Sequence, residues 1–308
     1  MQFRQMRYFV KIVDAGSFSR AAATIHVAQP ALTHQIHELE EKLGVQLLQR
    51  SARGVRPTAA GEVLYREASV ILRLLEQLPG VVRSSGGDAE GAVNLGLASS
   101  IARTVAGPFI EACKSALPKV TLKFSDFDSE SIRGMVETSN LDLALLFEDE
   151  QVSSVSRRPL FRQRLYLLRR ESAAVGAASI SLSDLSKLPL VLPGQPNGRR
   201  SAIDRAFMAA GLTANVAVES GGAMSSELSA VRSGIGNAIL PIGDFAGLSG
   251  DGLAAPQLIE PPLFLTASII SSSDFPLTNA GEAVCNLLIQ FVGQHSRSTA
   301  MPGADWIN

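Results

Sequence analysis

The stretch from Ser17 to His37 constrains the fold of this chain more than any other. It predicts two short helices joined by a tight turn. Three consecutive alanines from Ala21 allow the helices to approach closely, and Pro30 suits a first helical turn, where its missing N–H needs no partner. In a helix-turn-helix unit the second helix enters the major groove of DNA. The stretch therefore predicts a DNA-binding head. The alternative is a helical pair that only packs, with its polar residues facing water.

The second of these helices has two chemically distinct faces. At 100° per residue one stripe of this helix faces the core and contains Leu32, Ile36, Leu39 and Leu43. The opposite face carries groups that suit DNA, because glutamine pairs with N6 and N7 of adenine, and hydroxyl and imidazole groups donate to phosphates or bases. The candidates on this face are Gln29, Pro30, Thr33, His34 and His37. Two histidines on one helix make a poor metal site, so no metal is expected.

A wing is expected directly after this helix. Residues 47–50 and 54–57 read as two short strands around a Ser-Ala-Arg-Gly tip. Arg50, Arg53 and Arg56 lie on the two strands and the tip, and arginines there suit phosphates or the minor groove. The alternative is that the three arginines are only solvated.

A long helix is expected to begin after Thr58. Apolar residues then recur at spacings of four and three, which is a heptad stripe: Leu64, Ala68, Ile71, Leu75, Leu78 and Val82. A helix reaching Leu78 would be about 30 Å long. Such a seam favours dimerisation through a second copy, and packing on its own chain is the alternative. Pro79 and Gly80 predict that this helix stops or kinks, and residues 84–87 predict a hinge.

These motifs resemble the DNA-binding domain of LysR-type transcriptional regulators, most closely the nitrogen-assimilation-control branch. The resemblance spans nearly all of residues 3–65 and includes Tyr8-Phe9, Gly16-Ser17-Phe18, Gln29-Pro30-Ala31-Leu32-Thr33, Leu43-Gly44, Leu47-Leu48 and Pro57-Thr58. It implies a winged helix-turn-helix over 1–60, a dimerisation helix and hinge over 58–87, and an effector domain over 91–295. It also implies DNA contacts by Gln29, Pro30, Thr33, His34 and Arg53. Two departures stand out: Ala28 replaces the Ser that caps this helix in many members, and His34 replaces the more common Arg or Gln.

From Gly91 strands and helices alternate in two series, with a further strand expected at 165–168, which predicts two doubly wound α/β subdomains. Their expected bounds are 91–162 with 268–295, and 163–267. The family resemblance implies the same architecture, similar to periplasmic binding proteins, with the effector held between the subdomains. Residues 296–308 are expected to form a flexible tail.

Candidate effector contacts lie where a strand gives way to a helix, because ligands of such sheets bind beyond the carboxyl ends of strands. Hydroxyls and backbone N–H groups at these places suit a carboxylate or another anion. The candidates are Ser99, Ser100, Ile101, Phe147, Pro193, Gly194, Gln195 and Gly222. Arg199 and Arg200 suit an anionic effector as well, with plain solvation as the alternative. Ordinary caps and turns are the alternative for the other positions.

Several classes of protein are disfavoured. No Walker A sequence and no nucleophile elbow occurs, so neither an enzyme nor a cofactor is expected. The longest apolar stretches, such as 263–270, are too short to span a membrane. Cys113 and Cys285 stand in apolar helical contexts, which predicts reduced thiols, and no signal peptide opens the sequence; both observations favour the cytoplasm.

Charge is distributed unevenly along the chain. Residues 1–87 contain 11 Lys and Arg against 7 Asp and Glu, whereas the whole chain has a net charge of −1. A basic head on an acidic body is typical of a nucleic-acid reader attached to a sensor. We therefore expect a ligand-modulated regulator that binds promoter DNA as a dimer or a dimer of dimers, with RNA polymerase as a further partner. The alternative is a small-molecule sensor with a non-functional DNA-binding head.

Overall fold

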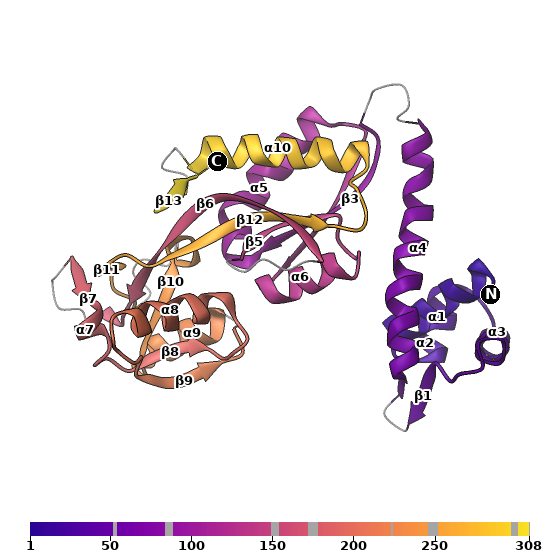
Figure 1. The fold of residues 1–308 in the computed structure, drawn as a ribbon, viewed down its shortest axis with the longest axis horizontal. Helices are drawn as coiled ribbons and strands as arrows, with labels where there is room; N and C mark the ends of the chain where they lie inside the picture. The colour runs from indigo at the N-terminus through magenta and orange to yellow at the C-terminus, as the bar shows by residue number, and fades with distance from the viewer. Residues whose placement is uncertain are drawn as a thin grey trace. The chain divides into compact units, whose positions relative to one another are not determined.

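The computed structural model describes residues 1–51, 54–83, 89–148, 154–171, 178–222, 224–245, 252–296 and 301–307 (Figure 1). The chain forms two compact units, one made by residues 1–86 and one comprising nearly all of residues 87–308. No helix in the described ranges is both long and apolar enough to cross a membrane.

The first unit is the expected winged helix-turn-helix with its long following helix. Its elements are α1 (Phe3–Ala15), α2 (Phe18–Thr24), α3 (Gln29–Leu43), β1 (Leu48–Ser51), β2 (Gly54–Pro57) and α4 (Ala59–Arg83). Most of the stripe predicted for α3 is buried, since Leu32, Ile36 and Leu39 are at most 1% exposed. The prediction is wrong for Leu43, the last residue of the helix, which is 41% exposed. They pack with Phe9 and Ile12 of α1 in one small core. The core face predicted for α3 from the helical period therefore packs against α1.

The expected end of the long helix at Pro79 is wrong, because Pro79 lies inside α4. The helix continues to Arg83, because a proline removes only one N–H donor and the turns on either side still form. The heptad stripe divides into two parts. Ala68 is buried and packs with the head's own core, whereas Ile71, Leu75, Leu78 and Val82 are 40–64% exposed. The hinge expected at residues 84–87 lies outside the described residues.

The second unit is a mixed α/β structure of two subdomains, as expected. Its elements are β3 (Gly91–Ala98), α5 (Ser99–Ala116), β4 (Val120–Phe127), α6 (Ser129–Glu137), β5 (Leu143–Phe147), β6 (Val155–Leu168), β7 (Ser179–Ser181), α7 (Leu182–Leu185), β8 (Leu190–Pro193), α8 (Gly198–Ala209), β9 (Val216–Ser220), α9 (Met224–Arg232), β10 (Asn237–Pro241), the short 3-10 helix η3 (Ile242–Phe245), β11 (Gln257–Glu260), β12 (Phe264–Ser272), α10 (Asn279–Ser296) and β13 (Ala304–Trp306). The main strand order is β4-β3-β5-β12-β6-β10-β8-β9.

Strand β6 joins the two subdomains. Parallel strands β3, β4 and β5 belong to one subdomain, and parallel strands β8, β9 and β10 to the other. Between them, β6 pairs antiparallel with β12 over its first part and with β10 over its last residues (Figure 1). The strand expected at 165–168 is only the end of this 14-residue element. The earlier residues of β6 were not predicted as a strand, because its arginines and a register shift in its pairing with β12 interrupt the alternation of apolar and polar residues.

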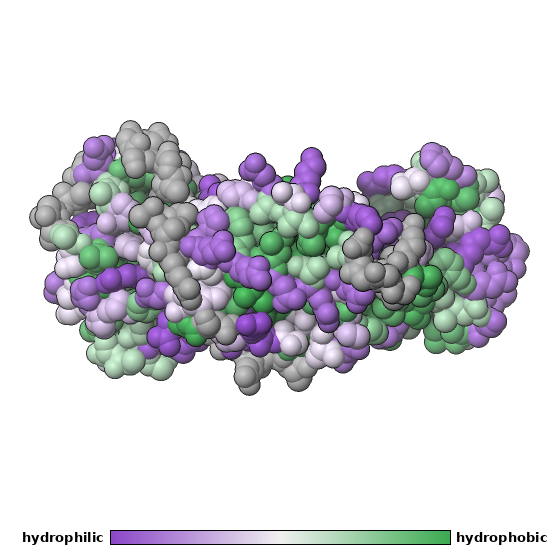
Figure 2. Space-filling model, turned by 90° about the horizontal axis from the view of Figure 1, so that it is seen from above, coloured by the Kyte–Doolittle hydropathy of each residue, from purple (hydrophilic) through white to green (hydrophobic). Residues whose placement is uncertain are grey.

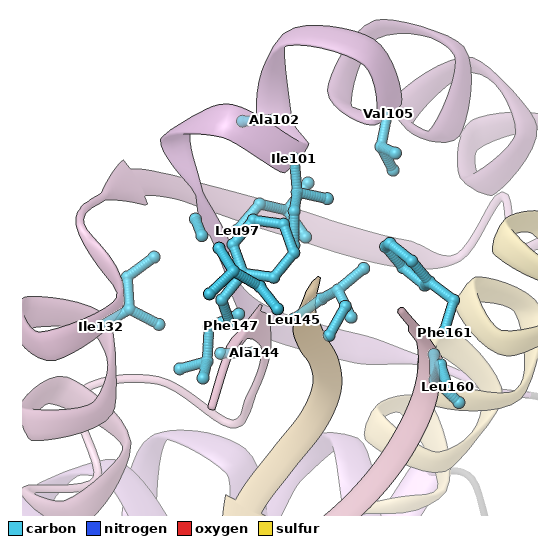
Figure 3. Close-up of a cluster of buried hydrophobic side chains, with 14 of the residues drawn as sticks. Leu97, Ile101, Ala102, Val105, Ile132, Ala144, Leu145, Phe147, Leu160 and Phe161 are labelled. Carbon is cyan, nitrogen blue, oxygen red and sulfur yellow. The ribbon is translucent and has the colours of Figure 1, made fainter. Parts of the chain in front are cut away.

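A buried apolar cluster positions the start of α5. Figure 3 shows Leu97 of β3, Ile101 and Val105 of α5, Leu145 of β5 and Phe161 of β6 directed into this core, and all five are at most 3% exposed. Because Ile101 is locked into the core, the first turn of α5 is held at the carboxyl end of β3.

The expected flexible tail is wrong for residues 301–307. Strand β13 pairs antiparallel with Phe161–Gln163 of β6, and Met301 is 6% exposed. Trp306 lies against Gly293 of α10, where an added Cβ would approach its ring to 3.2 Å. These long-range contacts order the segment despite its Ser, Pro and Gly content. Leu287 and Ile289 of α10 are half-exposed and pack against the core of this unit. Figure 2 shows apolar residues lying among polar ones on the face seen from above.

Candidate DNA-binding surface and effector cleft

The helix-turn-helix turn leaves the start of α3 open to solvent. Ser17 caps α2, since its side chain accepts a hydrogen bond from the Arg20 backbone N–H. Helix α3 has no such cap: Ala28 stands at its N-cap and Pro30 in its first turn. An N-terminus without a side-chain cap carries unsatisfied N–H groups and the positive end of the helix dipole. The departure noted at Ala28 therefore leaves this end of α3 suited to a negatively charged surface.

The structure places the five α3 candidates on one side of the helix. Gln29, Pro30, His34 and His37 are exposed, and Thr33 is half-exposed. The imidazole Nδ1 of His34 lies 3.5 Å from Glu38, and Nε2 of His37 lies 3.6 Å from Glu41. Carboxylates thus accompany both histidines, which limits how closely phosphates approach the second half of the helix. The first half, around Gln29 and Thr33, is free of acidic residues.

One contact at this surface was not predicted. The Ser19 hydroxyl of α2 donates to the side-chain oxygen of Gln29 at 3.0 Å. Both residues are exposed. Sequence spacing places them on different helices, and only the turn geometry brings them together.

The wing is fixed against the head. The Val55 N–H donates to the Gly16 carbonyl at 3.0 Å, and a Cβ on Gly54 would lie 2.7 Å from that same oxygen. The Arg50 guanidinium lies 4.3 Å above the Phe18 ring, a cation–π arrangement that orients its charge. Arg56 of β2 is exposed, and Arg53, the third wing arginine, lies outside the described residues.

A cavity of about 440 Å³ opens between the two subdomains of the second unit. Ser99, Ser100, Phe147 and Gly222, all expected near an effector, lie on its wall. Ile101 is buried and lines a smaller neighbouring cavity. Pro193, Gly194 and Gln195 are not part of the main wall, which is formed instead by the residues that follow them at the start of α8. The residues of this segment that line the cavity therefore begin at Pro196, after the three that were predicted.

Charged residues on both sides of the cavity form ion pairs. Arg133 of α6 contacts Glu148 at 2.9 Å and also pairs with Glu130. Burial disfavours the charged form of Arg133, but the two carboxylates outweigh it and raise its pKa. Arg199 of α8 makes a bidentate pair with Glu227 of α9, at 2.8 and 2.7 Å. Asp126 and Asp128 add negative charge to the wall, and hydrogen bonds from Ser131 lower the pKa of Asp128 although burial opposes them.

Arg133, Glu148 and Glu227 were missed by sequence reasoning. Glu227 is 0% exposed and Glu148 is 9% exposed. Nothing local distinguishes them from solvated helix and loop carboxylates, because each is paired with an arginine on another element. Arg200, considered for an anionic ligand, pairs with Asp204 and Glu219 outside the cavity wall.

The described residues contain no cluster of three or more His, Cys, Asp or Glu placed to hold a metal ion. Cys113 is buried and Cys285 half-buried, and both are free thiols. Burial raises the pKa of each thiol, which disfavours the reactive thiolate.

Two family models match this chain. Residues 3–62 match the bacterial regulatory helix-turn-helix protein of the lysR family, and residues 86–293 match the LysR substrate binding domain. The nitrogen assimilation regulatory protein nac of Klebsiella aerogenes is 32% identical over 301 residues, covering 96% of this chain and 97% of the relative.

Solved structures share the fold over the full length. Full-length CbnR complexed with its target DNA matches with a TM-score of 0.69 at 22% identity, over 96% of this chain and 99% of CbnR. Full-length OxyR from Pseudomonas aeruginosa matches with a TM-score of 0.71 at 22% identity, over 100% of this chain and 99% of OxyR. With its winged helix-turn-helix head and its two-subdomain effector unit, the chain belongs to the LysR family of bacterial transcriptional regulators.

Proposed function

We propose that this regulator reads promoter DNA with the exposed face of α3 and with the wing, and that a small molecule in the cavity between the subdomains modulates this binding. The observation that carries the proposal is the two-sided character of α3. Its apolar stripe is sealed in the head's core, while Gln29, Pro30, Thr33, His34 and His37 face outward. In a helix-turn-helix the second helix inserts such a polar side into the major groove.

Base reading is assigned to Gln29, the residue at the open start of α3. Thr33, His34 and His37 extend the contact along the helix, and Arg50 supplies a positive charge from the wing. Arg53 belongs to the same proposal on the strength of the family resemblance. The full-length likeness to CbnR, which was solved with its target DNA, supports the same mode of binding.

The effector is assigned to the cavity wall that contains Ser99, Ser100, Phe147 and Gly222. The cavity has a volume within the range of small-molecule sites. Its wall combines carboxylates with arginines that already have carboxylate partners, at Arg133 and Arg199. This mixture supports a small polar effector with hydrogen-bonding groups, and the hydroxyls at the start of α5 would receive an anionic part of it. Binding that favours one quaternary arrangement needs a coupling of about 1–3 kcal/mol to alter promoter affinity.

We assign the exposed part of the α4 heptad stripe to contact with a second copy of the chain. Exposed apolar residues at heptad spacing are what a partner helix buries, and a dimer presents two heads to two half-sites. Leu78 is 51% exposed and is not part of the head's core, so Leu78→Glu leaves that core intact while placing a charge in the seam. We expect this variant to dissociate in analytical ultracentrifugation at concentrations where the wild type is a dimer or a dimer of dimers.

The setting that fits this role is the cytoplasm, where promoter DNA and RNA polymerase are available as partners. The relatives are regulators rather than enzymes, which supports a non-catalytic role.

The deciding experiment compares Gln29→Ala with the wild type in a gel-shift series. On a promoter fragment bound by the wild type, the loss should be about 1–3 kcal/mol, with little change on scrambled DNA. Gln46→Ala is the matched control, because it removes the same exposed side chain outside α3. Equal losses on both DNAs would remove Gln29 as a base reader. A wild type without preference for any upstream fragment would instead favour a sensor with a non-functional head.

A further inference from the structure

The hydrogen bond between Ser19 and Gln29 links the two helices of the helix-turn-helix at the surface assigned to DNA. Ser19 lies in the first turn of α2 and Gln29 is the first residue of α3. The serine hydroxyl donates to the glutamine Oε1 at 3.0 Å, and both side chains are exposed. An exposed bond of this kind adds little to folding stability, because water competes for both partners.

Glutamine has a flexible side chain whose two polar ends differ. To read adenine, Oε1 must accept from N6 while Nε2 donates to N7, so the amide has to face the base edge in one orientation. An amide oxygen has two lone pairs. Ser19 occupies one of them, which leaves the second lone pair of Oε1 directed away from Ser19. Within the described part of the chain, no protein acceptor is recorded for Nε2.

We propose that Ser19 is a positioning residue that sets the orientation of the Gln29 amide for bidentate reading of an adenine. This inference rests on the proposed function and adds a specificity determinant outside the recognition helix. Holding the amide before DNA arrives reduces the side-chain freedom lost on binding, and a preorganised side chain binds its target more tightly.

A direct contact between the Ser19 hydroxyl and a phosphate is the competing role. The two roles differ in what they predict. A phosphate contact strengthens binding to every sequence and contributes to its salt dependence. A positioning role acts only through Gln29, so it affects the base pair that Gln29 reads and disappears when Gln29 is absent.

The test is a double-mutant cycle on the full-length protein. The probe is a duplex selected from a random-sequence library by the wild type, together with versions of it substituted at each base pair. Ser19→Ala should weaken binding to the selected duplex by about 3- to 10-fold. The preference for adenine over other bases should fall at the one position where Gln29→Ala also abolishes it. In the Gln29→Ala background, Ser19→Ala should change affinity by less than about 2-fold.

Two further variants control the cycle. Ser19→Thr keeps the hydroxyl and should retain the wild-type base preference. Thr24→Ala removes another exposed hydroxyl from α2, one that bonds only the Arg20 carbonyl of its own helix at 3.0 Å in the described structure, and should leave DNA binding unchanged. Circular dichroism melts establish that all variants are folded.

Additive losses in the cycle would overturn the positioning role, as would a uniform loss on all sequences with a salt slope reduced by about one. These results would leave the proposed function intact. If the library yields no enriched sequence with the wild type, the proposed function itself fails and this inference fails with it.

Discussion

The guanidinium of Arg199 and the carboxylate of Glu227 form a bidentate ion pair at the wall of the effector cavity. Glu227 is fully buried, and its Oε1 also accepts from the Ser220 hydroxyl at 2.8 Å. Arg199 further donates to the Ile239 carbonyl at 2.9 Å. The pair therefore ties α8, α9, β9 and β10 together in the second subdomain.

Glu227→Gln keeps the shape of this side chain and removes its charge. The Arg199 guanidinium then loses its counter-charge in a largely buried place, so the free energy of unfolding should fall by about 3 kcal/mol. Urea unfolding followed by the fluorescence of Trp306, the one tryptophan of the chain, measures the loss in the effector unit. Lys187→Gln is the control, because it breaks an exposed pair with Asp184 and should cost under about 0.5 kcal/mol. Equal costs for the two variants would show that the buried pair contributes no more than a surface pair.

Gly303→Ala tests how the C-terminal strand is held on β6. Gly303 has φ +71°, and an added Cβ would lie 2.6 Å from the Tyr166 hydroxyl. Both backbone strain and crowding should lower the free energy of unfolding, together by about 2–3 kcal/mol. Gly211→Ala shares the positive φ, at +69°, but meets nothing within 4 Å and should cost about 1 kcal/mol.

The contribution of crowding to the cost of Gly303→Ala can be measured separately from that of backbone strain. In a Tyr166→Phe background the hydroxyl is gone, so the cost of Gly303→Ala should fall. It should stay above that of Gly211→Ala, because the Cε2 atom of residue 166 and the Gln163 Nε2 still lie 3.2 Å from the added Cβ. The same Trp306 fluorescence measures the wild type, the three single variants and the double variant. An unchanged cost in the Tyr166→Phe background would show that the clash with the hydroxyl does not determine the loss.

Local periodicity predicted the head well and the long-range pairing poorly. The core face of α3 follows from the helical period of its own residues, so Leu32, Ile36 and Leu39 were placed without any knowledge of their partners. Strand β13 and the first part of β6 were missed, because a strand of three residues or one rich in arginine is stabilised by neighbours far away in sequence. The rule that ligands bind beyond strand ends selected Ser99 and Ser100, and both line the cavity. It could not find Arg133 or Glu227, whose role depends on a partner from another helix or loop.

Ionisation of Tyr65 should lower the stability of the head at alkaline pH. Its hydroxyl donates to Asp14 at 2.7 Å, joining α4 to α1, and burial together with this bond raises the pKa of Tyr65 above its ordinary value of 10.0. The unfolded chain then loses the tyrosine proton at a lower pH than the folded protein. The contribution of Tyr65 is therefore fully present below about pH 10 and is lost as pH rises through the folded-state pKa.

The measurement compares wild type with Tyr65→Phe by circular dichroism in urea. At neutral pH the variant should be less stable by about 1 kcal/mol, the net value of one hydrogen bond. This advantage of the wild type should shrink between about pH 9 and pH 11. A difference between the two proteins that stays constant over this range would contradict the shifted titration.

Ala28→Ser should stabilise the start of α3. The N-cap residue has extended backbone angles, φ −70° and ψ 131°, and lacks a side-chain acceptor. Pro30 provides no N–H, so an introduced hydroxyl would accept from the Ala31 backbone N–H, which is otherwise one of the unsatisfied donors of a helix start. The expected gain is about 1 kcal/mol. Hydrogen–deuterium exchange of peptides from α3 measures it, since slower exchange in the first turns reports fewer openings.

Ala23→Ser is the control for this test, because it should destabilise its helix whereas Ala28→Ser should stabilise α3. Ala23 is an exposed residue inside α2, where a serine replaces the best helix former and should cost about 0.5 kcal/mol. If a serine slowed exchange at both positions, the effect would not come from capping. If Ala28→Ser left α3 exchange unchanged, the open N-terminus would already be satisfied by water. A stabilised variant that still bound its selected duplex less tightly would show that the uncapped N–H groups serve the DNA contact, because the new hydroxyl would occupy a donor that phosphate otherwise receives.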